Sequence, residues 1–73
     1  MEWQAYIERR KNVMTGKAVF RGSRITVAHV LRELGIGMST HDLLRGHPDL
    51  SPKHLLAAMS YAADVINQRI APE

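Results

Sequence analysis

The sequence predicts a mainly α-helical fold, in which three helices with a helix-turn-helix layout follow a short N-terminal β hairpin. Three observations lead to this prediction. Apolar residues recur every three or four positions after residue 26, helix-capping residues precede the periodic segments, and an apolar–turn–apolar pattern precedes the first helix. We expect one domain over residues 1–73, made of a basic β arm at 1–25 and a trihelical body at 26–70.

The first two helices are marked by capping residues at both ends. Thr26 is the expected N-cap of a helix at about 27–34, and Gly35 is expected to end it in the left-handed conformation. Ser39 is the expected cap of the second helix, which the Gly46-His47-Pro48 segment terminates. The apolar residues of the first helix follow the helical period and are Val27, Val30, Leu31 and Leu34.

The third helix is the longest, and its start is the clearest in the chain. Ser51 is the expected cap, and Pro52 occupies the first helical position, where its missing N–H is not needed. An apolar face is expected to continue for about 18 residues and to pack on the other helices. Its members are Leu55, Leu56, Met59, Ala62, Ala63, Ile66 and Ile70.

The segment before the first helix predicts a β hairpin. Residues 18–20 and 25–27 are apolar or β-branched and flank Arg21-Gly22-Ser23-Arg24, in which the glycine suits a type II′ turn. An isolated hairpin is marginally stable in water, so its strands need a neighbour. This neighbour is either the segment near Ile7 or the hairpin of a second copy, and we favour the second copy. Residues 3–7 fit either a short strand or a helical turn.

Composition and charge limit the class of protein. The net charge is +3, but residues 1–25 hold six Lys and Arg against two Glu, whereas residues 26–73 hold four against five Asp and Glu. A basic arm on a near-neutral body fits phosphate contacts. There is no cysteine, which excludes disulfides and thiolate zinc sites, and no apolar run suggests a membrane span or a signal peptide. We therefore expect a cytoplasmic protein, and the small core favours a homodimer.

Several short motifs along the chain occur in the order of a known family pattern. Their positions are Trp3, Ile7, Gly16-Lys17, Gly22, Arg24-Ile25, Gly37-Met38-Ser39, Pro48, Leu50 and Tyr61-Ala62. Through these positions the sequence is similar to the bacterial VapB-like antitoxins classified as the domain of unknown function 433, over residues 2 to about 67. It departs from the family pattern at Ala18, Ser23 and His47, and at residues 10–16 (RKNVMTG), which replace the family's Asp-Pro turn.

The resemblance implies a homeodomain-like trihelical fold with an N-terminal β element, and dimerisation. It also implies the antitoxin half of a toxin–antitoxin pair, which binds a PIN-like ribonuclease toxin and operator DNA and represses its own operon. Two alternatives stay open: a protein-interaction module without DNA affinity, and a stand-alone helix-turn-helix regulator. Little salt-dependent DNA binding would favour the interaction module.

The candidate nucleic-acid-binding residues are basic or imidazole side chains on the arm and on the second and third helices. Arg21 and Arg24 flank a tight turn, where their guanidinium groups suit phosphate or carboxylate, although Arg24 also fits a structural role. Lys53 and His54 begin the third helix, where a recognition helix contacts DNA, but a solvated or toxin-binding face fits equally well. The full set is Lys17, Arg21, Arg24, His41, Arg45, Lys53 and His54.

No feature of the sequence predicts catalysis or a cofactor. The four histidines, at positions 29, 41, 47 and 54, form no i, i+4 pair with one another, so we expect no metal site. No Ser/His/Asp set and no glycine-rich phosphate loop can be argued from the spacing. The chain is therefore expected to be a non-enzyme without a small-molecule substrate, a cofactor or a membrane partner.

Overall fold

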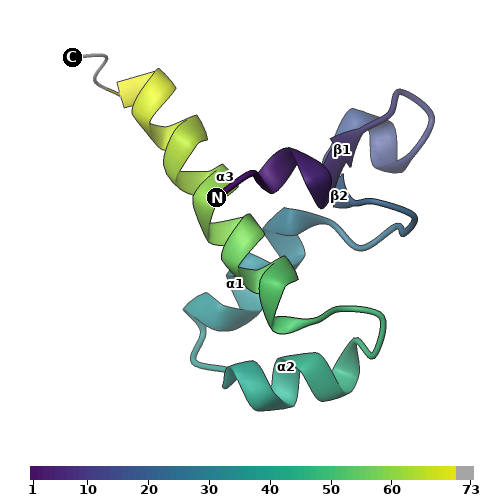
Figure 1. The fold of residues 1–73 in the computed structure, drawn as a ribbon, viewed down its shortest axis with the longest axis vertical. Helices are drawn as coiled ribbons and strands as arrows, with labels where there is room; N and C mark the ends of the chain where they lie inside the picture. Colours follow the sequence, from purple (N-terminus) through teal and green to yellow (C-terminus); the bar gives the residue numbers. More distant parts are fainter. Residues whose placement is uncertain (71–73) are drawn as a thin grey trace.

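The computed structural model describes residues 1–70 and is mainly helical, with a two-stranded antiparallel hairpin at the N-terminus (Figure 1). At this level the predicted fold class is confirmed. None of the helices in the described part of the chain is both long enough and apolar enough to cross a membrane. The elements in chain order are the 3₁₀ turn η1 (Trp3–Ala5), β1 (Ile7–Arg9), the 3₁₀ turn η2 (Met14–Gly16), β2 (Ala18–Phe20), α1 (Val27–Gly35), α2 (Thr40–Gly46) and α3 (Pro52–Ile70).

The hairpin pairs different strands from those that the sequence predicted. β2 is hydrogen-bonded to β1, with Ile7 opposite Phe20 and Arg9 opposite Ala18. The expected partner at residues 25–27 contributes a single bridge, between Val19 and Thr26. Of the two expected neighbours, the strand near Ile7 is confirmed, so the chain supplies this strand with its own partner. Pairing with a second copy, the neighbour that we favoured, stays a prediction.

The turn after β2 is tight, as predicted, but of another type. The Ser23 N–H donates to the Phe20 carbonyl over 3.0 Å, and the Phe20 N–H donates to the Ile25 carbonyl over 3.0 Å. Gly22 is the third residue of the Phe20–Ser23 turn and has φ +77°. A positive φ at the third position alone is typical of a type II turn, whereas type II′ requires it at the second.

Replacing Gly22 with alanine tests this backbone requirement. No atom lies within 4 Å of a Cβ built at Gly22, so the cost comes from the left-handed conformation alone. We expect Gly22→Ala to lower the free energy of unfolding by about 1–2 kcal/mol, measured by chemical denaturation. Gly46→Ala is the matched control, since Gly46 is helical with a similarly open Cβ position, and it should be neutral or slightly stabilising. Equal effects of the two substitutions on the free energy of unfolding would contradict a left-handed backbone at Gly22.

The predicted N-caps of α1 and α2 are confirmed. The Thr26 side chain accepts a hydrogen bond from the backbone N–H of His29 over 3.0 Å. The Ser39 hydroxyl accepts one from the N–H of Asp42 over 3.0 Å. Both caps satisfy a first-turn donor that has no partner within the helix, which is why the two starts could be predicted from local sequence.

The end of α1 differs from the prediction. Gly35 remains within the helix, and Gly37 takes the left-handed conformation instead, with φ +102°. The Met38 N–H donates to the Glu33 carbonyl and the Gly37 N–H to the Leu34 carbonyl, each over 3.1 Å. These two bonds form a Schellman motif, in which the glycine lies one residue after the C-cap. Gly35 and Gly37 both fit the sequence pattern of a glycine that ends a helix. The prediction that Gly35 takes this position was wrong.

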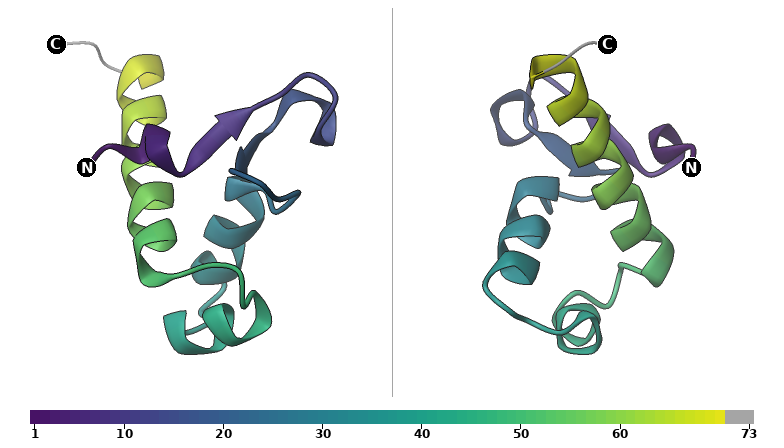
Figure 2. Two further views of the ribbon diagram at one scale, coloured as in Figure 1. Left: turned by 45° about the vertical axis from the view of Figure 1, so that its right-hand side comes forward. Right: turned by 90° about the vertical axis from the view of Figure 1, so that its left-hand side faces the viewer.

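The core lies between the hairpin, α1 and α3, and the N-terminal segment contributes directly to it. Figure 2 shows η1 crossing α3, with the hairpin above α1 and with α2 at the far end of the molecule. α2 contributes one buried residue, Leu43. The buried cluster consists of Ile7, Ala18, Phe20, Val27, Val30, Leu43, Leu50, Leu55, Ala57 and Ala58.

Only part of the apolar face predicted for α3 is buried. Leu55 is 3% exposed and Ala58 is fully buried, but Leu56 is 55%, Met59 47% and Ile66 55% exposed. Leu56 and Met59 directly follow the buried residues Leu55 and Ala58, and one step along a helix is a rotation of about 100°. The prediction combined two neighbouring rows of apolar side chains on α3, and only the row with Leu55 packs against the core. The side chain of Ile70, also expected on this face, lies outside the described residues.

Candidate nucleic-acid and partner-binding surfaces

Glu8 on β1 holds two of the arginines of the basic arm. Its carboxylate lies 3.2 Å from Arg21 Nη1 and 3.4 Å from Arg10 Nε, and its side chain is only 17% exposed. Arg21 Nε also donates to the backbone carbonyl of Gln4 over 2.9 Å. Arg21 therefore ties the turn after β2 to the N-terminal segment, which is the structural role that the sequence assigned more readily to Arg24.

The other predicted cations lie on the surface. Arg24, Lys17 and Lys53 are exposed and have no ion pair or side-chain hydrogen bond to the residues whose side chains are described, 1–68. Their charges are available to a ligand. Arg45 on α2 lies 4.0 Å from Asp42, and both side chains are largely exposed, so this pair contributes little to stability. His41, also on α2, is exposed.

His54 points into the protein. Its Nδ1 accepts a hydrogen bond from the Ser51 backbone N–H over 3.0 Å, and the Ser51 hydroxyl lies at the same distance. The half-buried ring packs edge-on against Tyr6, with centroids 5.2 Å apart, and against Phe20 at 5.6 Å. Because Nδ1 accepts, the neutral ring carries its hydrogen on Nε2. His54 therefore caps α3 and joins it to the hairpin, and only Nε2 remains for a ligand.

The packing of His54 brings two parts of the predicted DNA-binding set together. Lys53 precedes His54 in the chain, and Arg21 follows Phe20, so both cations flank the junction between α3 and the hairpin. Arg24 lies one residue after the Phe20–Ser23 turn, inside the loop that the hydrogen bond from the Phe20 N–H to the Ile25 carbonyl closes. The contact of His54 with Phe20 joins the first turn of α3 to this loop after β2. The exposed cations that these two segments carry, Arg21, Arg24 and Lys53, are called the basic surface below. His41, Arg45 and Lys17 come from other elements.

A second surface of different character lies along α3. An open groove of about 400 Å³ runs between α1 and α3. Arg9 and Lys17 also line it, and they give an otherwise apolar groove a cationic border. Ile66 forms part of its wall and belongs as well to the exposed stripe with Leu56 and Met59. Groove and stripe together are called the α3 apolar surface below. The remaining lining residues are Ala18, Thr26, Val27, Ala28, Leu31, Tyr61, Ala62 and Val65.

Contacts from the N-terminal segment hold one edge of this groove. Trp3 Nε1 donates to Asp64 on α3 over 2.8 Å, and its ring packs edge-on against Tyr61 at 4.7 Å. The Tyr61 hydroxyl in turn accepts a hydrogen bond from Arg9 Nη2 over 2.9 Å. The N-terminal segment is thereby fixed to the middle of α3.

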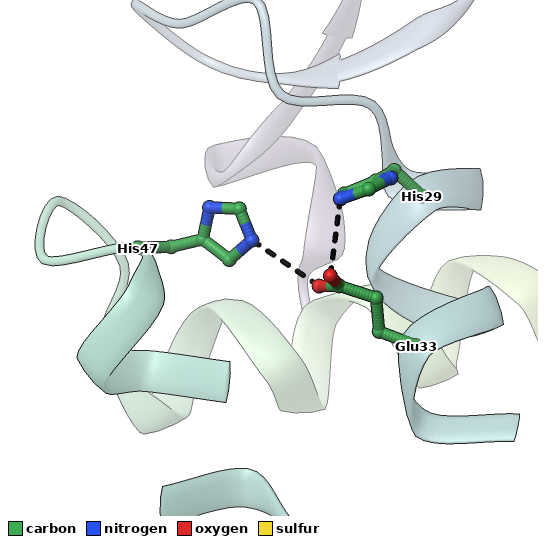
Figure 3. Close-up of side chains that lie close together, drawn as sticks. All are labelled: His29, Glu33 and His47. Atoms are coloured by element: carbon green, nitrogen blue, oxygen red, sulfur yellow. Dashed lines mark hydrogen bonds and ion pairs between the residues drawn. The ribbon is translucent and has the colours of Figure 1, made fainter. Parts of the chain in front are cut away.

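A cluster that sequence reasoning missed lies between α1 and the end of α2. His29, Glu33 and His47 point toward one another (Figure 3). His29 Nε2 lies 3.3 Å from one Glu33 oxygen, and His47 Nε2 lies 3.2 Å from the other. The expectation of no metal site compared histidines only with one another. The i, i+4 pair of His29 and Glu33 was the available signal, but the arrival of His47 depends on the fold.

Comparison with family models matches residues 7–62 to the family described as "Protein of unknown function (DUF433)". The match spans the hairpin, all of α1 and α2, and the first half of α3. Comparison with curated proteins and with solved structures found no significant match.

Proposed function

This chain belongs to the DUF433 family of proteins of unknown function, and from its surfaces we propose that it is an antitoxin-type, DNA-binding regulator. In this proposal it binds operator DNA through the basic surface and a PIN-like ribonuclease toxin through the α3 apolar surface. The helices would act as a homeodomain-like helix-turn-helix, with α3 as the recognition helix. The proposed role is binding, without catalysis.

The observation that carries the proposal is the exposed apolar stripe on α3. Leu56, Met59 and Ile66 are each about half exposed in a chain of only 73 residues. Large apolar side chains gathered on one helix face are typical of a surface that a protein partner covers. The adjoining groove, with Arg9 and Lys17 at its border, suits a partner segment that combines apolar and acidic side chains.

The DNA-binding part rests on the charges at the start of α3. Lys53 is exposed on the first turn of α3, and recognition helices contact DNA with their N-terminal residues. Arg24 adds an exposed guanidinium from the turn that packs beside it, through Phe20 and His54. Phosphate contacts of this kind give an affinity that falls steeply with salt.

The test is binding to DNA from the chain's own promoter, measured by fluorescence anisotropy over a salt series. We expect Lys53→Gln and Arg24→Gln each to weaken binding and to reduce the salt slope by about 0.9, the value of one lost phosphate contact. Arg32→Gln is the matched control, since Arg32 is an exposed arginine on α1 outside the basic surface, and it should leave both quantities unchanged. Salt-independent binding, or none, would overturn the DNA-binding part.

The toxin-binding part is tested separately, with the product of the adjacent reading frame where that frame encodes a PIN-like ribonuclease. Ile66→Glu, at the shared edge of groove and stripe, should abolish a complex seen by light scattering, while Gln68→Glu, an exposed control on the same helix, should not. If the free chain is already a dimer that Ile66→Glu dissociates, then a second copy occupies the surface. In that case the assignment of this surface to the toxin is wrong.

A protein-interaction module without DNA affinity is the second candidate, and Glu8 favours it. The Glu8 carboxylate neutralises part of the charge of Arg21 and Arg10, so the arm presents less free charge than the sequence alone suggests. This candidate predicts that the complex with the partner forms normally, whereas promoter and unrelated DNA both fail to bind at low salt.

A further inference from the structure

We propose that His29, Glu33 and His47 form a binding site for a divalent transition metal of the zinc class, which connects α1 to the end of α2. The two histidines supply imidazole nitrogens and Glu33 a carboxylate oxygen (Figure 3). Two histidines and one glutamate are an established zinc-binding set, in which a further position stays open to water. The inference is independent of the proposed DNA and toxin binding.

The distances between the donor atoms are close to those that a metal requires. With metal–ligand bonds of 2.0–2.1 Å in a tetrahedral site, the donor atoms lie about 3.3 Å apart. The two nitrogen–oxygen distances are 3.3 and 3.2 Å, and they end on different oxygens of the Glu33 carboxylate, so Glu33 would bind the ion with both oxygens or turn to present one of them. With one atom from each residue, the donor atoms lie within 4.8 Å of one another, so the side chains would have to approach by up to about 1.5 Å to reach the tetrahedral spacing.

The charge balance also favours a cation. Glu33 faces two imidazole rings, and no Lys or Arg of the chain through residue 68 forms an ion pair with it. Neutral imidazole does not neutralise the carboxylate, whereas a divalent ion would do so and would bind both nitrogens. Nitrogen donors select zinc, nickel or copper over magnesium and calcium, which prefer oxygen donors.

The position of the cluster gives the metal a structural consequence. His29 and Glu33 are four residues apart on one face of α1, and His47 is the C-cap of α2. α2 is short and contributes only Leu43 to the buried core of the described chain. Glu33 and His47 have side chains 22% and 21% exposed, while His29 at 54% leaves the site open on one side. A bound ion would fix α2 against α1 at a second point.

The experiment is a titration of the untagged full chain with Zn²⁺ at constant pH, followed by calorimetry and by thermal unfolding. We expect one ion per chain, and at 100 times Kd a rise in Tm on the order of 10 °C that EDTA reverses. Mg²⁺ at the same concentration should leave Tm unchanged. Absence of zinc binding to the wild-type chain would overturn the proposal.

Single substitutions distinguish this site from binding elsewhere. His29→Gln, Glu33→Gln and His47→Gln should each weaken zinc binding at least about tenfold, the loss produced even by removing an outer partner of a ligand. His41→Gln, an exposed histidine on α2, is the matched control and should bind as the wild type does. His29 is the most exposed of the three, so its variant folds even where the others fail, and unchanged zinc affinity in it would refute the site.

Discussion

Replacing Leu55 with alanine should remove much of the stability of the fold. The Leu55 side chain is 3% exposed and belongs to the central cluster, and Leu→Ala at such positions costs about 2–5 kcal/mol. A domain of this size has a free energy of unfolding of only about 4–11 kcal/mol. We therefore expect a loss of at least about 10 °C in Tm, measured by circular dichroism with a parallel urea titration.

The neighbouring residue provides the control. Leu56 has the same side chain, one position along the same helix, but it is 55% exposed. Leu56→Ala should change the free energy of unfolding by no more than about 0.5 kcal/mol, because alanine also has the better helix propensity. Its effect should appear instead in binding to the toxin proposed as the partner of the α3 apolar surface. If both substitutions destabilise equally, the stripe is covered in the free protein, as it would be in a dimer.

The second large effect is expected for His54→Ala. The substitution removes the acceptor for the Ser51 N–H and two edge-on ring contacts, with Tyr6 and Phe20. A lost helix cap costs about 1 kcal/mol, and each aromatic pair about 0.5–1.5 kcal/mol. The expected loss is therefore about 2–4 kcal/mol in urea denaturation, a measure that a residue acting only in DNA binding would not affect.

His41→Ala is the matched comparison, because His41 belongs to the same predicted DNA-binding set but is exposed on α2. It should leave the free energy of unfolding unchanged within about 0.5 kcal/mol. A stable His54→Ala variant with reduced DNA binding would show that the ring acts on DNA and that its packing contributes little.

Local features of this fold could be predicted from sequence, because they depend on neighbouring residues. The hydroxyls of Thr26 and Ser39 each accept a hydrogen bond from the backbone N–H three residues further along the chain, and both caps were predicted correctly. The choice between Gly35 and Gly37 could not be made in the same way. Both glycines tolerate a left-handed backbone, and the energy of the last helical turn decides between them.

Features that depend on distant parts of the chain could not be predicted. β2 pairs with β1 across an eight-residue connection, while the nearer segment at 25–27 was the obvious candidate. The burial of Leu55 and the exposure of Leu56 depend on where α1 and the hairpin meet α3. The helical period of apolar residues alone is compatible with burial of either leucine.

The candidate sites also depend on contacts between distant parts of the chain, which the sequence pattern does not show. Arg21 and Arg24 were correctly placed at one turn, but the presence of Glu8 beneath Arg21 follows from strand register. His54 was placed correctly on the first turn of α3, yet its inward direction depends on Phe20. His47 reaches Glu33 only because α2 folds back on α1.

The length of α3 has a consequence for its motion. Its last turns extend past the other helices, where Asn67 and Gln68 are exposed (Figure 2). A helix end with little packing opens locally without unfolding the rest of the chain. Amide hydrogens there should exchange with deuterium long before those near Leu55. Slower exchange at this end on adding a ligand would locate the bound molecule without any substitution.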